Sequence, residues 1–166
     1  MKGNEQLKLN IENVLCESCL FTGHRELDES FDKNLLQESV ENAVQNGVKT
    51  FYVGMAKGFD LLCAETVVKI KENYPFVKMI ACIPCYNQEK SYSQADKKRY
   101  VELIKKADER VILSENYYRG CMQNRDRYMA EKGDMMICYC RKKTGGTAYT
   151  LSYFQKRKPT AKVIFL

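Results

Sequence analysis

The stretch MMICYCRKKTGGTAYTLSYFQ, residues 135–155, decides the fold class of this chain. It begins with five apolar residues, passes through a basic turn with two glycines, and continues with apolar residues at helical spacing. An uninterrupted apolar strand is typical of a parallel sheet, because such strands are buried on both faces. The stretch therefore predicts a strand, a glycine turn, and a helix that crosses back over the sheet.

The same alternation extends through the rest of the chain. The patterns predict strands at 18–22, 49–53, 77–83, 110–113, 135–139 and 163–166, with helices at 31–45, 59–72, 94–107, 121–131 and 145–155. Right-handed crossovers between parallel strands place helices on both faces of the sheet. We therefore predict an α/β fold of Rossmann-like type, a three-layer sandwich with a mostly parallel central sheet.

Length and composition predict one domain, residues 1–166, with its core from about residue 14 onward. Hydrophobic residues make up 45% of the chain, which is enough to build that core. No segment approaches the ~18 consecutive apolar residues of a membrane span. The first ten residues lack the apolar segment of a signal peptide. A cytoplasmic protein without a membrane partner is expected.

The chain has eight cysteines, an unusually high number. They include two C-x-x-C pairs, Cys16/Cys19 and Cys82/Cys85. The pairs lie too far apart for a zinc ribbon, and each adjoins an apolar stretch. Cysteine in a reducing compartment behaves as a small core residue rather than a disulfide. We expect core thiols, no metal site and no cofactor.

Polar residues and glycines directly follow several predicted strands. Ligands of open α/β sheets bind beyond the carboxyl ends of the strands, so these positions are the ligand-binding candidates. The candidates are Thr22, Gly23, His24 and Arg25 after the first strand, Gly54, Gly58 and Asp60 after the second, and Gly145, Gly146 and Thr147 after the fifth.

The segment Thr144-Gly145-Gly146-Thr147 leads directly into a helix. Its glycines let the backbone approach a ligand closely, and free N–H groups at a helix start favour an anion. An ordinary strand–helix turn with Thr147 as a cap is the alternative interpretation. Segment 54–60 matches neither G-x-G-x-x-G nor G-K-[ST], so a classical NAD or ATP site is not supported.

The predicted helix 121–131 is unusually polar, and Asn124 and Arg125 are further ligand-binding candidates. An exposed helix with internal salt bridges is the alternative. The formal net charge is +6, with basic clusters at 141–143 and 156–158. These clusters indicate either solvated surface or attraction of an anionic ligand, with nucleic acid the less favoured partner.

Four of these segments, taken in order, resemble a known family. Residues 21–25 (FTGHR), 54–60 (GMAKGFD), 125–129 (RDRYM) and 145–150 (GGTAYT) are similar to the YpsA-like branch of the SLOG (Smf/DprA–LOG) superfamily. The resemblance spans residues 18–166 and implies a Rossmann-like fold with a pocket for nucleotides or nucleotide derivatives. The superfamily includes phosphoribohydrolases, sensors of nucleotide signals and DNA-binding proteins, and its relatives imply self-association into a homo-oligomer.

The chain departs from the family pattern in places. Asp126 replaces an asparagine, the glycine loop is shorter than that of LOG enzymes, and residues 149–155 contain no carboxylate. We predict binding or sensing of a nucleotide or nucleotide-derived small molecule. One alternative is cleavage of an N-glycosidic bond, with Asp60 or Glu65 as the catalytic carboxylate. A second alternative is a nucleic-acid or protein-interaction module.

Overall fold

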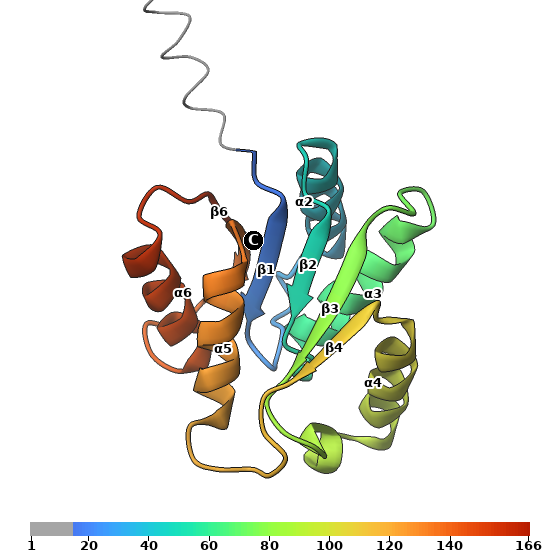
Figure 1. Cartoon of the computed structure of the whole chain (residues 1–166), viewed down its shortest axis with the longest axis vertical. Helices are drawn as coiled ribbons and strands as arrows, with labels where there is room; N and C mark the ends of the chain where they lie inside the picture. Colours follow the sequence, from blue (N-terminus) through green and yellow to red (C-terminus); the bar gives the residue numbers. More distant parts are fainter. Residues whose placement is uncertain (1–14) are drawn as a thin grey trace, which may run out of the picture.

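All six predicted strands lie side by side in one sheet of the computed structural model, which describes residues 15–166 (Figure 1). The strands are β1 (Ser18–Gly23), β2 (Thr50–Val53), β3 (Lys78–Ile83), β4 (Glu109–Ile112), β5 (Met135–Tyr139) and β6 (Val163–Phe165). The helices are α2 (Lys33–Gln45), α3 (Phe59–Lys71), α4 (Gln94–Lys106), α5 (Cys121–Lys132) and α6 (Gly146–Arg157). Every neighbouring pair of strands is parallel, which confirms the Rossmann-like α/β fold.

The strand order β4-β3-β2-β1-β5-β6 contains one reversal of direction, between β1 and β5. The chain first builds the sheet outward from β1 to β4, and then returns to place β5 and β6 on the other side of β1. The connections that leave β1 and β5 therefore run to opposite faces of the sheet. Such a switch point opens a crevice at the carboxyl ends of its two strands.

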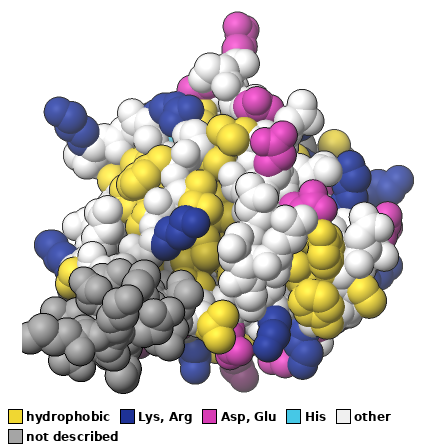
Figure 2. Space-filling view, turned by 90° about the horizontal axis from the view of Figure 1, so that it is seen from above, with side chains coloured by type: hydrophobic (Ala, Val, Ile, Leu, Met, Phe, Trp, Pro, Cys, Tyr) yellow, Lys and Arg dark blue, Asp and Glu magenta, His cyan; other side chains and the backbone are white. Residues whose placement is uncertain are grey.

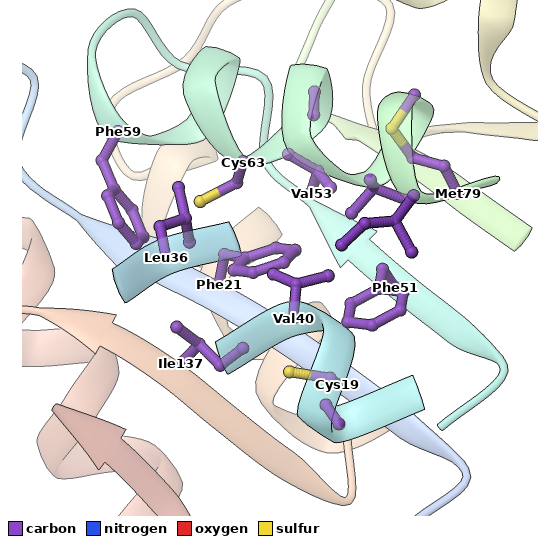
Figure 3. Packing of buried hydrophobic residues seen from close by; sticks show 14 of the residues in the cluster. Cys19, Phe21, Leu36, Val40, Phe51, Val53, Phe59, Cys63, Met79 and Ile137 are labelled. Carbon is purple, nitrogen blue, oxygen red and sulfur yellow. The ribbon is translucent and has the colours of Figure 1, made fainter. Parts of the chain in front are cut away.

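The two faces of the sheet have separate hydrophobic layers. Helices α2, α3 and α4 cover one face, and α5 and α6 cover the other (Figure 1). Side chains alternate along a strand, so neighbouring residues of β1 enter different layers. Phe21 packs toward α2 and α3, near Leu36, Val40 and Cys63 (Figure 3), whereas Leu20 packs toward α5 and α6.

Local chemistry sets where α2 begins. The helix starts at Lys33, two residues after the predicted boundary, because the Asp32 side chain accepts hydrogen bonds from the backbone N–H groups of Asn34 and Leu35. The predicted polar loop after β3 contains a short 3-10 helix, η1 (Gln88–Ser91).

No helix within residues 15–166 is long and apolar enough to cross a bilayer. All eight cysteines are free thiols, and six of them are buried.

Figure 2 shows the end of the molecule where the strands begin, and on its visible part acidic and basic side chains are interspersed.

Candidate functional site

A cavity of about 950 Å³ lies at the carboxyl ends of the strands. The loops after β1, β2, β4 and β5 all contribute to its walls, as do the first turns of α3, α5 and α6. Most of the residues that line the cavity fall within four ranges of the chain, 22–28, 56–60, 117–126 and 139–147. The volume is that of a typical small-molecule or cofactor pocket.

Three helices begin at this cavity without a side-chain cap. Gly58, Gly120 and Gly145 are the N-cap residues of α3, α5 and α6, and none of these helices has a side-chain hydrogen bond at its N-cap. By contrast, the side chains of Asp32 and Ser93 cap α2 and α4.

The first N–H groups of a helix need an acceptor. Phe59 at the start of α3 donates to the His24 carbonyl and Cys121 at the start of α5 donates to the Tyr118 carbonyl. The start of α6 makes no such bond within residues 15–166 and therefore presents free donors at its positive dipole end.

The starts of α5 and α6 are both open, since a Cβ atom on Gly120 or on Gly145 would meet no atom within 4 Å. Gly145 has φ +98°, a conformation that strongly favours glycine. Gly146 has no such constraint, and a Cβ atom built on it would meet no atom within 4 Å. Neither backbone conformation nor packing therefore requires glycine at position 146. A ligand that approaches the helix start closely would require it.

Gly54 directly follows β2 and packs against Asp60 and Arg125, two of the residues that line the cavity. A Cβ atom there would lie 2.8 Å from Asp60 Oδ2 and 2.9 Å from Arg125 Nη1, so only glycine leaves room for both side chains. The Gly54 carbonyl accepts hydrogen bonds from Arg125 Nη1 and from Gln88 Nε2, the latter at 2.9 Å. The Arg125 Nε group donates to Asp126 Oδ1 at 2.7 Å. Arg125 thus joins the end of β2 to α5.

Burial controls the ionisation of this cluster. It raises the pKa of Asp60 to about 6, although Arg125 and the hydrogen bond from the Ala56 N–H at 3.2 Å oppose the shift. Burial disfavours the charge on Arg125, but Asp126 and Asp60 outweigh that effect and raise the pKa of Arg125. The floor of the cavity therefore holds a cation beside a carboxyl group whose pKa burial raises well above its ordinary value.

His24 connects the loop after β1 to the loop after β5. Its Nε2 atom accepts a hydrogen bond of 2.7 Å from the backbone N–H of Arg141, and its ring packs edge-on against Tyr139. Burial, Lys142 and Arg141 lower the pKa of His24, in that order of importance. The acceptor role requires neutral Nε2, so the neutral imidazole is the form that ties these two loops together.

The cavity walls contain more cationic than anionic side chains. The cations are Arg25, Lys57, Arg119, Arg125, Arg141 and Lys142, and the anions are Glu26, Asp28, Asp60 and Asp126. Two of the anions are matched locally: Asp126 pairs with Arg125, and Asp28 lies 3.8 Å from Arg141. Together with the helix ends, this balance favours an anionic ligand.

Comparison with known proteins assigns the chain to a family. The family model YpsA, described as "YspA SLOG family", matches residues 19–164. The chain belongs to the YpsA family of SLOG proteins.

Two relatives and one solved structure place the YpsA-family chain among known proteins. It is similar to UPF0398 protein BH1768 of Halalkalibacterium halodurans, with 25% identity over 81% of this chain and 73% of that protein. It is also similar to UPF0398 protein YpsA of Bacillus subtilis, with 25% identity over 69% and 66% of the two chains. DNA processing protein A from Helicobacter pylori, described as having a unique single-stranded DNA binding mode, shares the fold at TM-score 0.61 and 20% identity. The alignment covers 89% of this chain and 64% of that one.

Most of the site residues predicted from the sequence of this YpsA-family chain meet at the cavity. Those that line it are Thr22, Gly23, His24, Arg25, Asp60, Arg125, Gly145, Gly146 and Thr147. Gly54 packs against Asp60 and Arg125, as described above. Gly58 has φ +79° and packs against the Arg25 backbone, so it shapes the start of α3.

Besides Gly54 and Gly58, two further residues predicted for the site of this YpsA-family chain lie outside the cavity lining. Asn124 is half-buried on α5 and is not among the lining residues, whereas Gln123 and Arg125 are. Glu65 points away from the site and forms a bidentate ion pair with Arg99 of α4, at 2.7 and 2.9 Å. Of the two catalytic candidates, only Asp60 reaches the cavity.

Sequence reasoning missed the loop after β4. Tyr117, Arg119 and Gly120 line the cavity, although no residue after the fourth predicted strand was among the candidates. The rule that selected the other loops applies equally to this one and would have found it. Arg141 and Lys142 also line the cavity. The sequence indicated their cluster, 141–143, as either solvated surface or an attraction for an anionic ligand, but did not place it at the site.

The described residues offer no metal centre. Within residues 15–166, no three His, Cys, Asp or Glu side chains are grouped so that they could hold a metal ion. The two C-x-x-C pairs therefore do not combine into a ligand set in this part of the chain.

Proposed function

We propose that this protein binds a nucleotide or nucleotide-derived small molecule, with its phosphate at the start of α6. The observation that carries this proposal is the uncapped helix start at Gly145 and Gly146, open to a cavity of about 950 Å³. A helix N-terminus is a ready-made phosphate site, because free N–H groups and the helix dipole both favour an anion. Membership of a SLOG family supports the same conclusion.

The cavity is large enough for the rest of such a ligand, and its lining side chains suit one. Arg25, Lys57 and Arg119 provide cations around its walls, and the exposed ring of Tyr117 provides an aromatic surface. Aromatic rings bind the flat faces of nucleobases, and arginine binds phosphate in a bidentate manner. The combination suits a molecule that is both anionic and planar.

Single-stranded DNA is a second candidate ligand. The fold neighbour DNA processing protein A of Helicobacter pylori is described as binding single-stranded DNA. A nucleic-acid role predicts a steep loss of affinity as salt concentration rises, because each neutralised phosphate releases counterions. A gel shift with a single-stranded oligonucleotide at two salt concentrations measures this directly.

Hydrolysis of an N-glycosidic bond is a third candidate, and it would depend on Asp60. The Glu65–Arg99 ion pair lies outside the cavity, and α6 contains no carboxylate. Incubation with nucleoside monophosphates followed by chromatography for free base distinguishes an enzyme from a binding protein. Release of base that Asp60→Asn abolishes would assign the protein a hydrolase activity.

The substitution Gly146→Ala tests the proposed binding site. Its methyl group meets no protein atom, so the fold should persist, but the methyl group would occupy the space in which a phosphate approaches α6. A thermal-shift screen with nucleoside monophosphates, ADP-ribose and cyclic nucleotides should raise the Tm of the native protein by ligand linkage. The same screen with Gly146→Ala should show a much smaller shift.

Asp32→Ala is the matched control for this experiment. It removes the cap of α2, which lies outside the cavity, so it lowers stability without touching the ligand site. Its ligand-induced shift should equal that of the native protein. The proposal fails if no ligand in the panel shifts the native protein, or if Gly146→Ala retains the full shift.

A further inference from the structure

A second, smaller hollow, the α6 groove, adjoins the cavity along α6. It measures about 360 Å³ and is lined by Lys143, Thr144, Gly145, Ala148, Tyr149, Ser152, Tyr153 and Lys156. Thr144 and Gly145 line both hollows, so the two share a wall at the start of α6. A ligand held at Gly145 can therefore extend from one hollow into the other.

The groove is lined by two tyrosine rings that are held in place. Tyr149 and Tyr153 stack with their ring centroids 6.2 Å apart and an interplanar angle of 26°. The Tyr149 hydroxyl accepts a hydrogen bond from Arg127 Nη1 at 3.0 Å, and the Tyr153 hydroxyl donates to Glu131 Oε1 at 2.7 Å. Both hydroxyl groups are thus directed toward α5, while Tyr149 remains 38% exposed.

The groove is also cationic. Lys143 lies at one end of it and Lys156, in the last turn of α6, at the other. Neither lysine forms a salt bridge within residues 15–166. The Glu131 carboxylate, which is bonded to Tyr153, is also 3.5 Å from Arg157. An exposed aromatic ring in a cationic groove is the recurring composition of surfaces on which the bases of single strands stack.

We propose that the α6 groove, defined by the eight residues above, binds a second nucleotide unit joined by a phosphodiester to the one in the cavity. The inference rests on the proposed function, because the first unit must sit at Gly145. Tyr149 lies one helical turn from Gly145, about 6 Å along the axis. Its ring stacks on the second base, and Lys143, which precedes the start of α6, neutralises the linking phosphate.

The test compares a one-unit with a two-unit ligand on the full chain by titration calorimetry. The probes are dAMP and the 5′-phosphorylated dinucleotide pdApdA. The native protein should bind pdApdA roughly tenfold or more tighter than dAMP, which is the size of effect expected for stacking one base. Tyr149→Leu should remove most of this gain and leave the affinity for dAMP unchanged.

Matched controls isolate the groove. Tyr86→Leu changes an exposed tyrosine that lines neither hollow, so it should leave both affinities as they are. Lys143→Gln, at a residue that lines the groove but not the cavity, should weaken pdApdA more than dAMP, whereas Lys106→Gln, in the last turn of α4, should weaken neither ligand. A deoxyadenylate octamer identifies the source of the two units. Tighter binding of the octamer than of pdApdA indicates a nucleic-acid strand, and equal binding indicates a free dinucleotide.

The outcomes separate the two proposals. If dAMP binds and pdApdA binds no tighter, the proposed function stands and the groove proposal fails. If Tyr149→Leu weakens dAMP and pdApdA equally, Tyr149 does not act on a second unit, and the groove proposal again fails. If neither probe binds the native protein and the wider ligand panel also gives no shift, the proposed function fails first.

Discussion

Asp60 is a buried carboxyl group whose proton is coupled to folding. The native state raises its pKa from 3.8 to about 6, chiefly through burial. Below pH 3.8, the pKa of the group in the unfolded chain, both the folded and the unfolded chain hold the proton. The contribution of neutral Asp60 to the stability of the fold is complete there. As pH rises through about 6 the folded state must lose the proton, and the contribution is lost. Ionisation of Asp60 therefore lowers the stability of the fold as the pH rises toward neutrality.

Replacing Asp60 by asparagine should stabilise the protein at pH 7.5. The amide keeps an oxygen for the Ala56 N–H and needs no buried charge, so we expect a gain of about 1–3 kcal/mol. Urea unfolding at pH 4 and pH 7.5 checks this, because the gain should shrink toward zero at the lower pH. The exposed substitution Glu102→Gln is the control. An equal gain at both pH values would contradict the assignment.

Gly54 shows how far residue-level prediction from the sequence could go. Its place after the second strand correctly located it at the edge of the sheet where the cavity lies. What it does there depends on two side chains, of Asp60 and Arg125, that arrive from different elements. Strand and helix periodicity predicts where elements lie, but not which side chains of distant segments share one space. For the same reason the sequence did not exclude Glu65, whose partner Arg99 lies 34 residues away.

The helices divide into two groups by the way they begin. Asp32 and Ser93 close the starts of α2 and α4 with side-chain hydrogen bonds. Glycines begin α3, α5 and α6, and these are the three starts at the cavity. Helical periodicity predicted all five helices, although α5 is unusually polar, whereas the short η1 turn has no periodic signal and was not predicted. The side-chain caps that stabilise helices thus belong to different helix starts from those at the proposed ligand site.

Removing the cap of α2 should lower stability alone. Asp32→Ala leaves the N–H groups of Asn34 and Leu35 without their acceptor, at a cost of about 1 kcal/mol. For a chain of this length that corresponds to a fall in Tm of about 2–4 °C. Glu38→Ala, an exposed change in the middle of α2, should alter the Tm much less. An unchanged Tm in Asp32→Ala would show that water replaces the cap without loss.

At the scale of the whole molecule, β1 joins the two layers. Its carboxyl end forms one wall of the cavity, and its consecutive side chains Leu20 and Phe21 enter opposite hydrophobic layers. The strand lies between β2 and β5, so it also lies at the reversal of strand order that creates the cavity. Disturbing either layer should therefore affect the other through the same strand. This coupling is what the prediction of a single domain requires.

Leu20→Ala and Phe21→Ala should each destabilise one common unfolding transition. Both side chains are fully buried, so we expect costs of about 2–5 and 3–5 kcal/mol respectively. Urea unfolding followed by circular dichroism and by tyrosine fluorescence should give coincident curves for the native protein and for both variants. Leu35→Ala, which alters an exposed leucine of α2, should cost far less. If Leu20→Ala shifted only one of two separate transitions, the layers would unfold independently, and the domain prediction would be wrong even though they share a sheet.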